Sequence, residues 1–177
     1  MAAGITILPG TGGGAFAQPT DYPVLASPAF AAAADFNGDG KPDLAIADEG
    51  SNAVSILLNN GAGGFRSRAD YAVLSQPDCI AVGDFNGDGH PDLAVGNFGS
   101  DAISILLGNA DGTFRPRVDY GAGGDPQSIV VADFNGDGKL DIAVNNAHTA
   151  PGISVLSVTD VSAASTGMAY RTWPRSP

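Results

Sequence analysis

A hexapeptide repeated at a fixed interval constrains the fold of this chain more than any other feature. Asp-Phe-Asn-Gly-Asp-Gly begins at Asp35, Asp84 and Asp133, so consecutive copies start 49 residues apart. A phenylalanine, an Asp-Tyr pair and a proline recur at the same interval. They are Phe16, Phe65 and Phe114; Asp21-Tyr22, Asp70-Tyr71 and Asp119-Tyr120; and Pro28, Pro77 and Pro126. Repetition of the whole unit, spacers included, indicates duplication of one supersecondary element.

Each repeat is predicted to contain four short β-strands. In the central repeat, apolar runs at 79–83, 93–95 and 102–107 are bounded by Gly, Asn and Asp residues that are typical of turns. In the fourth segment, residues 113–120, the side chains of Phe114, Pro116 and Val118 alternate with two arginines, which predicts a half-exposed outer strand. No window shows a helical period, so a stack of helical repeats is excluded.

Four antiparallel strands per repeat predict an all-β fold of β-propeller blades. A closed propeller takes about four to eight blades, and the chain holds fewer than four repeats, so we expect an incomplete ring or an open array. We interpret residues 1–177 as a single repeat domain. Its parts are a half blade at 5–34, full repeats at 35–83 and 84–132, a partial repeat at 133–156 and a divergent tail at 157–177.

The loop that begins with each hexapeptide carries oxygen donors with the spacing of a hard-cation site. Side chains at loop positions 1, 3, 5 and 9 and the backbone carbonyl of position 7 can turn toward one centre. The predicted ligands are Asp35, Asn37, Asp39, Lys41 and Asp43; Asp84, Asn86, Asp88, His90 and Asp92; and Asp133, Asn135, Asp137, Lys139 and Asp141, with the lysines and the histidine supplying only their carbonyl oxygens. Oxygen ligands with three carboxylates favour Ca²⁺ over Zn²⁺ or Mg²⁺.

An EF-hand loop opens in the same way, but it needs a bidentate Glu at position 12 and flanking helices. Here position 12 is Ile46, Val95 or Val144, as expected where a strand leaves the loop. We therefore predict about three Ca²⁺ sites that stiffen strand connections. We favour this structural role over a calcium-sensing one, because three like charges converge in each loop without metal.

The motifs of the central repeat resemble the FG-GAP/VCBS repeat, the unit of integrin-α-type β-propellers. The resemblance rests on residues 84–97, 103–109 and 111–114 and extends over about residues 5–156. It implies that the loop joins the first and second strands of a blade and that Ca²⁺ rigidifies this hairpin. It also implies an extracellular or cell-surface protein, since family members serve in adhesion, in lectins and in extracellular polysaccharide enzymes.

The composition narrows the possible partners. A net charge of −11, from 19 acidic and 8 basic residues, argues against nucleic acid as a partner. No apolar run reaches the ~20 residues of a membrane span, and no secretory signal is recognisable, so membrane insertion is not expected.

The lone cysteine, Cys79, is expected to be a small buried apolar residue. His90 and His148 form no catalytic set with other residues, and we expect no enzymatic activity.

Three hypotheses about function remain open at this point. The chain is a Ca²⁺-stabilised module that binds an extracellular protein or carbohydrate, or it is the scaffold of an extracellular polysaccharide lyase or hydrolase. Alternatively, two chains complete one ring as a homodimer. The pairs Arg66/Arg68 and Arg115/Arg117 are expected on the solvent face of the outer strand, where they could attract acidic glycans. Tyr22, Tyr71 and Tyr120 are expected to pack between blades.

Overall fold

The computed structural model describes residues 3–66, 68–147, 152–156 and 170–172. Within these ranges the regular secondary structure is β-strand apart from two short 3-10 turns, η1 (Glu49–Ser51) and η2 (Phe98–Ser100). The predicted all-β fold is therefore confirmed. No helix in these ranges is long and apolar enough to cross a membrane. His148 and, apart from residues 170–172, the predicted tail at 157–177 lie outside the described residues.

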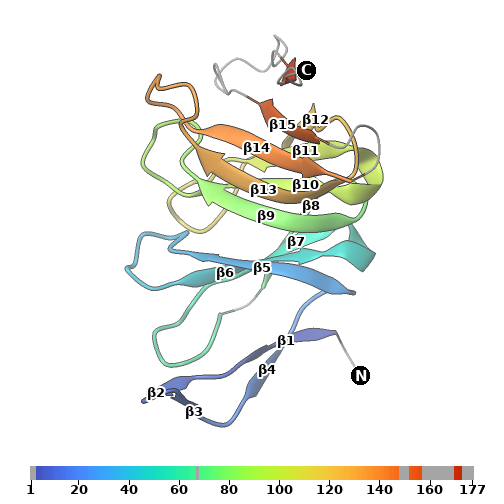
Figure 1. The fold of residues 1–177 in the computed structure, drawn as a ribbon. Coiled ribbons are helices and arrows are strands. Elements are labelled where there is room, and N and C mark those ends of the chain that lie inside the picture. Colours follow the sequence, from blue (N-terminus) through green and yellow to red (C-terminus); the bar gives the residue numbers. More distant parts are fainter. Residues whose placement is uncertain (1–2, 67, 148–151, 157–169, 173–177) are drawn as a thin grey trace.

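Three antiparallel sheets of four strands each form the body of the molecule (Figure 1). Blade 1 consists of β5 (Pro28–Ala34), β6 (Asp43–Asp48), β7 (Ala53–Leu57) and β8 (Ala69–Ala72). Blade 2 consists of β9 (Pro77–Gly83), β10 (Asp92–Asn97), β11 (Ala102–Leu106) and β12 (Val118–Gly121). Blade 3 consists of β13 (Pro126–Ala132), β14 (Asp141–Asn146), β15 (Gly152–Leu156) and β16 (Tyr170–Thr172). In each blade the strands pair in chain order, as propeller blades do.

A half-blade precedes blade 1. In it β1 (Gly4–Ile7) pairs with β4 (Thr20–Pro23), and the connection between them forms the hairpin β2 (Gly10–Gly12) and β3 (Ala15–Phe16). Ile5 pairs with Tyr22 in the register in which Val54 pairs with Tyr71, so β1 and β4 correspond to the outer two strands of a blade. Leu8 is consequently 52% exposed, whereas its equivalent in blade 1, Leu57, is 3% exposed.

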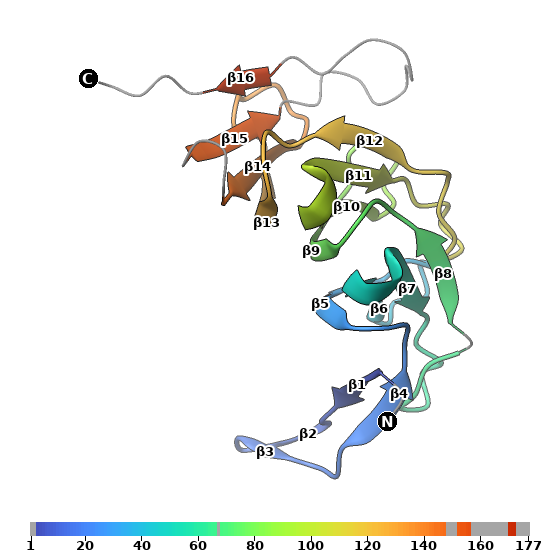
Figure 2. The same ribbon diagram turned by 90° about the vertical axis from the view of Figure 1, so that its right-hand side faces the viewer.

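The blades follow one another along an open arc that does not close into a ring (Figure 2). The first strands, β5, β9 and β13, lie on one side of this arc, and the fourth strands β8 and β12 lie on the other. The expected incomplete ring is therefore confirmed for the residues that the structure describes.

Two hydrophobic cores lie between consecutive full blades, and a third, around Val24, Ile46 and Leu57, lies between the half-blade and blade 1. The core between blades 1 and 2 contains Phe36, Val54, Ile56, Leu93 and Val95. The core between blades 2 and 3 contains Phe85, Ile103, Ile105, Ile142 and Val144. Strands β7 and β11 are buried along their whole length because a blade in the middle of the array is covered on both faces. This burial explains why the sequence of these strands reads as a short continuous apolar run.

Two of the three periodic tyrosines make ring contacts across blade boundaries at the outer rim, and the third, Tyr120, packs partly buried against the core between blades 2 and 3. The ring of Tyr22 meets that of Phe65 edge-on, with centroids 4.9 Å apart, and Tyr71 meets Phe114 in the same way at 5.4 Å. Edge-to-face pairs of this kind add about 0.5–1.5 kcal/mol to the burial of the rings. The prediction that Cys79 is buried is also confirmed, since it is 3% exposed.

The predicted outer strand at 113–120 is shorter than expected. Strand β12 begins only at Val118, and Phe114 forms an isolated bridge with Gly108. Pro116 has no N–H to donate, and Phe114 turns inward against Phe36 and Tyr71, which together prevent a continuous ladder. The predicted alternation is wrong for Pro116 and Val118, because both are exposed.

Candidate metal sites

The three acidic loops occupy equivalent places in consecutive blades. Residues 35–42 join β5 to β6, residues 84–91 join β9 to β10, and residues 133–140 join β13 to β14. The loops project from the same end of the strands, along the left-hand side of Figure 1. The structure thus places each loop between the first and second strands of its blade, where the family resemblance implied it would be.

The first aspartate of each loop is the centre on which the loop winds. The carboxylate of Asp35 accepts hydrogen bonds from the N–H groups of Asp39 (3.1 Å) and Gly40 (2.7 Å). Asp84 accepts from Asp88 N at 3.1 Å and Gly89 N at 2.8 Å, and additionally from Gly87 N at 2.7 Å. Asp133 makes the same contacts as Asp84, from Gly136, Asp137 and Gly138.

Two positive-φ glycines permit this tight winding. In the first loop they are Gly38, with φ +70°, and Gly40, with φ +80°, and their counterparts in the other two loops also have positive φ. A residue with a Cβ would be strained in this conformation.

The asparagine and the second aspartate continue the winding with short Asx-turns. The side-chain oxygen of Asn86 accepts from Asp88 N at 2.8 Å, and a carboxylate oxygen of Asp88 accepts from His90 N at 3.0 Å. The other two loops make the same pair of contacts, at 2.8–3.0 Å. Positions 1, 3 and 5 therefore share one local backbone conformation in all three copies, as alternate ligands of one centre would require.

The aspartate at position 9 is buried and ties three segments together. Asp43 and Asp92 are 0% exposed and Asp141 is 1% exposed. One oxygen of Asp92 accepts from Phe85 N at 2.9 Å, and the other accepts from Gly108 N, beyond the third strand, at 2.8 Å. Asp43 makes the equivalent pair of bonds, to Phe36 N and to Asn59 N.

The sequence did not suggest this clamping role for the position-9 aspartates. The only signal was the recurrence of Asp at that position, which indicated a metal ligand equally well.

Opposing effects act on the acidity of the loop carboxyls. Burial raises the pKa of Asp92, and the negative charges of Asp88 and Asp84 raise it further, although two backbone N–H groups oppose the change. The hydrogen bond from Lys41 lowers the pKa of Asp39, and bonds from the N–H groups of Gly138 and its neighbours lower that of Asp133.

The donor set fits a hard cation. Each loop offers only oxygen, with no thiolate or imidazole among the side-chain donors, and an ionised carboxylate has about four lone-pair sites, so an oxygen bonded to an N–H group can still coordinate. Ca²⁺ would be held by the side chains at positions 1, 3, 5 and 9 and by the carbonyl of position 7.

The described residues contain no group of three carboxylate, imidazole or thiol side chains gathered closely enough to hold a metal. In their present conformation the loop carboxylates are satisfied by N–H groups and cations of the protein.

The three loops differ in what surrounds them. In the first loop Lys41 Nζ lies 3.0 Å from Asp39, and in the second Arg115 lies 3.8 Å from Asp88. Phe36 and Phe85 at position 2 are 2% and 4% exposed, because the following blade covers them, whereas Phe134 in the last loop is 51% exposed. The first loop is additionally bonded to the next blade, since Gly112 N donates to Phe36 O at 3.1 Å.

A chain of polar side chains, buried at its inner end and exposed at its outer aspartate, crosses each of the first two blades, and the sequence analysis missed it. In blade 2 Asn97 Nδ2 donates to Ser104 Oγ (3.0 Å), and Ser104 donates to Asp119 (2.7 Å). In blade 1 the same places are held by Asp48, Ser55 and Asp70. Each of these positions recurs at 49 residues, so a search for periodic polar residues within strands would have found the chain.

Comparison with known families gives a direct result. A family model described as FG-GAP-like repeat matches residues 35–95 and 84–144, which together span more than half of the chain. The chain belongs to the FG-GAP-like repeat family. Both matches start at the first aspartate of a loop and end within the second strand of the following repeat, so the acidic loops lie inside the family pattern.

The fold of this FG-GAP-like chain is also found among solved structures. The crystal structure of BBS1N in complex with ARL6DN, soaked with mercury, contains a chain that matches with a TM-score of 0.53 and 19% sequence identity. The match covers 81% of this chain and 39% of the other, so the present chain spans well under half the length of that propeller-type protein. A search of curated proteins gave no match.

Proposed function

We propose that this FG-GAP-like chain is a non-catalytic, Ca²⁺-stabilised propeller segment that binds a protein or carbohydrate ligand outside the cell. The observation that carries the proposal is one loop conformation that occurs three times. In each copy the side chains at positions 1, 3 and 5 offer only oxygen atoms as metal ligands. Extracellular Ca²⁺ concentrations saturate even sites with dissociation constants of about 10⁻⁴–10⁻³ M, so loops of this kind suit that compartment.

Ca²⁺ acts in this proposal on the stiffness of the blade and not on a reaction. The loop connects the first two strands, and the position-9 aspartate connects the loop to the end of the third strand. A cation at positions 1, 3 and 5 would offset the repulsion among the loop carboxylates, which adds to burial in raising the pKa of Asp92. The ligand surface would then be presented on rigid blades, which lowers the entropic cost of binding.

Binding to protein and glycan arrays tests the proposal. The folded chain is applied to the arrays in about 2 mM CaCl₂, roughly the extracellular concentration, and again with excess chelator. We expect it to bind at least one class of ligand only when Ca²⁺ is present. BBS1N in its solved structure is in complex with ARL6DN, which supports the inclusion of proteins among the ligands. Absence of any Ca²⁺-dependent binding by a folded sample would contradict the proposal, and turnover of a polysaccharide would favour an enzyme scaffold instead.

A further inference from the structure

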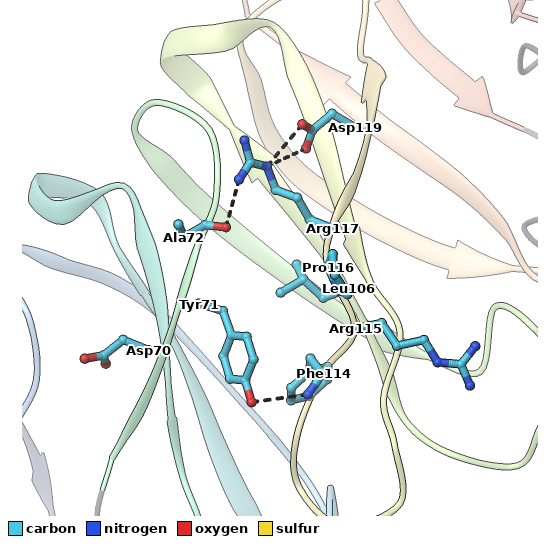
Figure 3. Close-up of a pocket in the computed structure, with 9 residues that line it drawn as sticks. All are labelled: Asp70, Tyr71, Ala72, Leu106, Phe114, Arg115, Pro116, Arg117 and Asp119. Atoms are coloured by element: carbon cyan, nitrogen blue, oxygen red, sulfur yellow. Dashed lines mark hydrogen bonds and ion pairs between the residues drawn. The ribbon is translucent and has the colours of Figure 1, made fainter. Parts of the chain in front are cut away.

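A groove lies at the outer rim between blades 1 and 2. It has a volume of about 490 Å³ and lies between β8 and the segment that leads into β12 (Figure 3). This volume falls within the range of about 300–1,000 Å³ that is typical of small-ligand sites. None of the predicted metal ligands lines the groove, so it is separate from the acidic loops.

One wall of the groove is a tyrosine held in a fixed position. Tyr71 projects from β8 toward Phe114, and its hydroxyl oxygen accepts a hydrogen bond from Phe114 N at 3.2 Å (Figure 3). The edge-on contact with the Phe114 ring, at 5.4 Å, fixes the plane of the tyrosine. A tyrosine hydroxyl that accepts one bond still has its own proton to donate. Tyr71 therefore offers both a flat apolar surface and a polar tip.

An arginine on the opposite side is equally well positioned. Arg117 Nε donates to the two carboxylate oxygens of Asp119, at 3.0 and 3.1 Å, and Nη1 donates to the carbonyl oxygen of Ala72 across the groove at 3.1 Å. Figure 3 shows the guanidinium between these two acceptors. Among the described residues no protein acceptor contacts Nη2. A preorganised donor beside a carboxylate acceptor is thus present on one face.

The charges of the groove restrict the chemistry of its ligand. The lining contains two arginines and two aspartates, so it is formally neutral within a chain of net charge −11. Arg117 pairs with Asp119 inside the groove, whereas Asp70 pairs with Arg68, which does not line the groove. An anionic ligand would be repelled by the field of the whole molecule. A purely apolar ligand would cover the guanidinium and the carboxylate without replacing their water, which is costly.

We propose that this groove binds a neutral, hydroxyl-rich ring such as a hexopyranose. The C–H face of such a ring would lie against Tyr71 and Pro116, while neighbouring hydroxyl groups would donate to Asp119 and accept from Arg117. This inference rests on the proposed binding function and names the ligand class and the site within it.

Sugar binding to the intact Ca²⁺-loaded chain tests this inference. Neutral methyl hexopyranosides and methyl glucuronide are titrated separately and followed by saturation-transfer NMR. We expect at least one neutral sugar to bind, and Arg117→Met, which keeps the aliphatic stem, to weaken that binding at least tenfold. Arg66→Met is the matched control, because Arg66 is exposed and does not line the groove. Tyr71→Phe, which keeps the ring contact with Phe114 but removes the hydroxyl group, is expected to weaken binding severalfold. It provides the test if Arg117→Met does not fold.

Three results would overturn the inference. They are absence of binding by every neutral sugar, equal affinity in wild type and both groove variants, and tighter binding of the glucuronide than of the neutral sugars. Thermal unfolding of the same samples with and without Ca²⁺ separates the two proposals. A Ca²⁺-dependent increase in Tm without sugar binding would remove this inference and leave the metal-stabilised module intact, whereas loss of both would remove both.

Discussion

Replacement of Asp48 by asparagine is expected to stabilise the protein. Asp48 is 0% exposed, one of its oxygens has no hydrogen-bond partner, and the other lies 2.6 Å from Ser55 Oγ. Ser55 Oγ also lies 2.9 Å from a carboxylate oxygen of Asp70. A hydroxyl group has one proton and can donate to only one of the two carboxylates. When Asp48 and Asp70 are both ionised, the serine proton serves only one of them. The other carboxylate oxygen then lies close to Ser55 Oγ with no proton between the two atoms.

Blade 2 shows how an asparagine relieves this conflict. At the equivalent position Asn97 Nδ2 donates to Ser104 Oγ at 3.0 Å, so the serine proton is free for Asp119 at 2.7 Å. Asn97 Nδ2 also lies within hydrogen-bond distance of the carbonyl oxygens of Val95 and Ala102. Its own Oδ1 has no partner, as in Asp48, but a neutral amide oxygen costs less to bury than a carboxylate oxygen.

The expected gain at pH 7 is about 1–3 kcal/mol, the usual cost of leaving a buried polar group without its partner, because the asparagine amide would donate to Ser55 and leave the serine proton for Asp70. For a domain of this size 1 kcal/mol corresponds to about 2–4 °C in Tm. The gain depends on pH, because burial, with the negative charge of Asp70 adding to it, raises the pKa of Asp48. Wild type binds the extra proton in the folded state, so it loses stability as pH rises from the unfolded to the folded pKa. The advantage of asparagine should therefore be full at neutral pH and vanish below about pH 4.

Urea unfolding at pH 7 and at pH 4, at constant Ca²⁺, measures this difference. The reverse substitution, Asn97→Asp, is the matched control and should destabilise blade 2 by a similar amount at pH 7. An Asp48→Asn protein that is less stable than wild type at pH 7, or whose gain is the same at both pH values, would refute the reasoning.

Further predictions compare residues that are equivalent in the repeat. Phe36→Ala should cost about 3–5 kcal/mol in unfolding free energy because the ring is 2% exposed, whereas Phe134→Ala, at 51% exposed, should cost less than about 0.5 kcal/mol; equal costs in urea unfolding would contradict the open arc. Asp92→Asn should cost about 1–3 kcal/mol, because it leaves either Phe85 N or Gly108 N without an acceptor, and a neutral result would show that the clamp is dispensable. Two chains that complete one ring should give a dimer mass by light scattering, and a strict monomer at all concentrations would exclude that assembly.

The repeat made most of the fold predictable. Because the repeat length is constant, the strands predicted within residues 79–107 also predicted the equivalent strands of the other blades. The continuous apolar runs of β7 and β11 are explained by burial of these strands on both faces. The end of the fourth segment was not predictable from alternation. The path of this segment depends on Phe114, which packs against Tyr71 of the preceding blade. The alternation of apolar and polar residues describes only the two faces of one strand, so it does not predict contacts between blades.

The candidate sites were predictable as residue sets but not as contacts. The spacing of Asp84, Asn86 and Asp88 indicated a wound loop, and the structure shows that loop in three copies. The spacing did not reveal that the two oxygens of Asp92 each accept a backbone N–H group and so clamp the loop to the end of the third strand. The groove at Tyr71 was also beyond sequence reasoning, since it arises only where two blades meet.

Thermal unfolding with millimolar Ca²⁺, compared with chelator and with millimolar Mg²⁺, tests the central claim most directly. A site filled to 100 times its dissociation constant contributes about 2.7 kcal/mol, or about 5–10 °C in Tm for a domain of this size. We expect Ca²⁺ to raise Tm by at least that amount, Mg²⁺ to raise it much less, and calorimetric titration to give about three Ca²⁺ per chain. An identical Tm in all three buffers would contradict the claim that the acidic loops are calcium sites that hold the blades together.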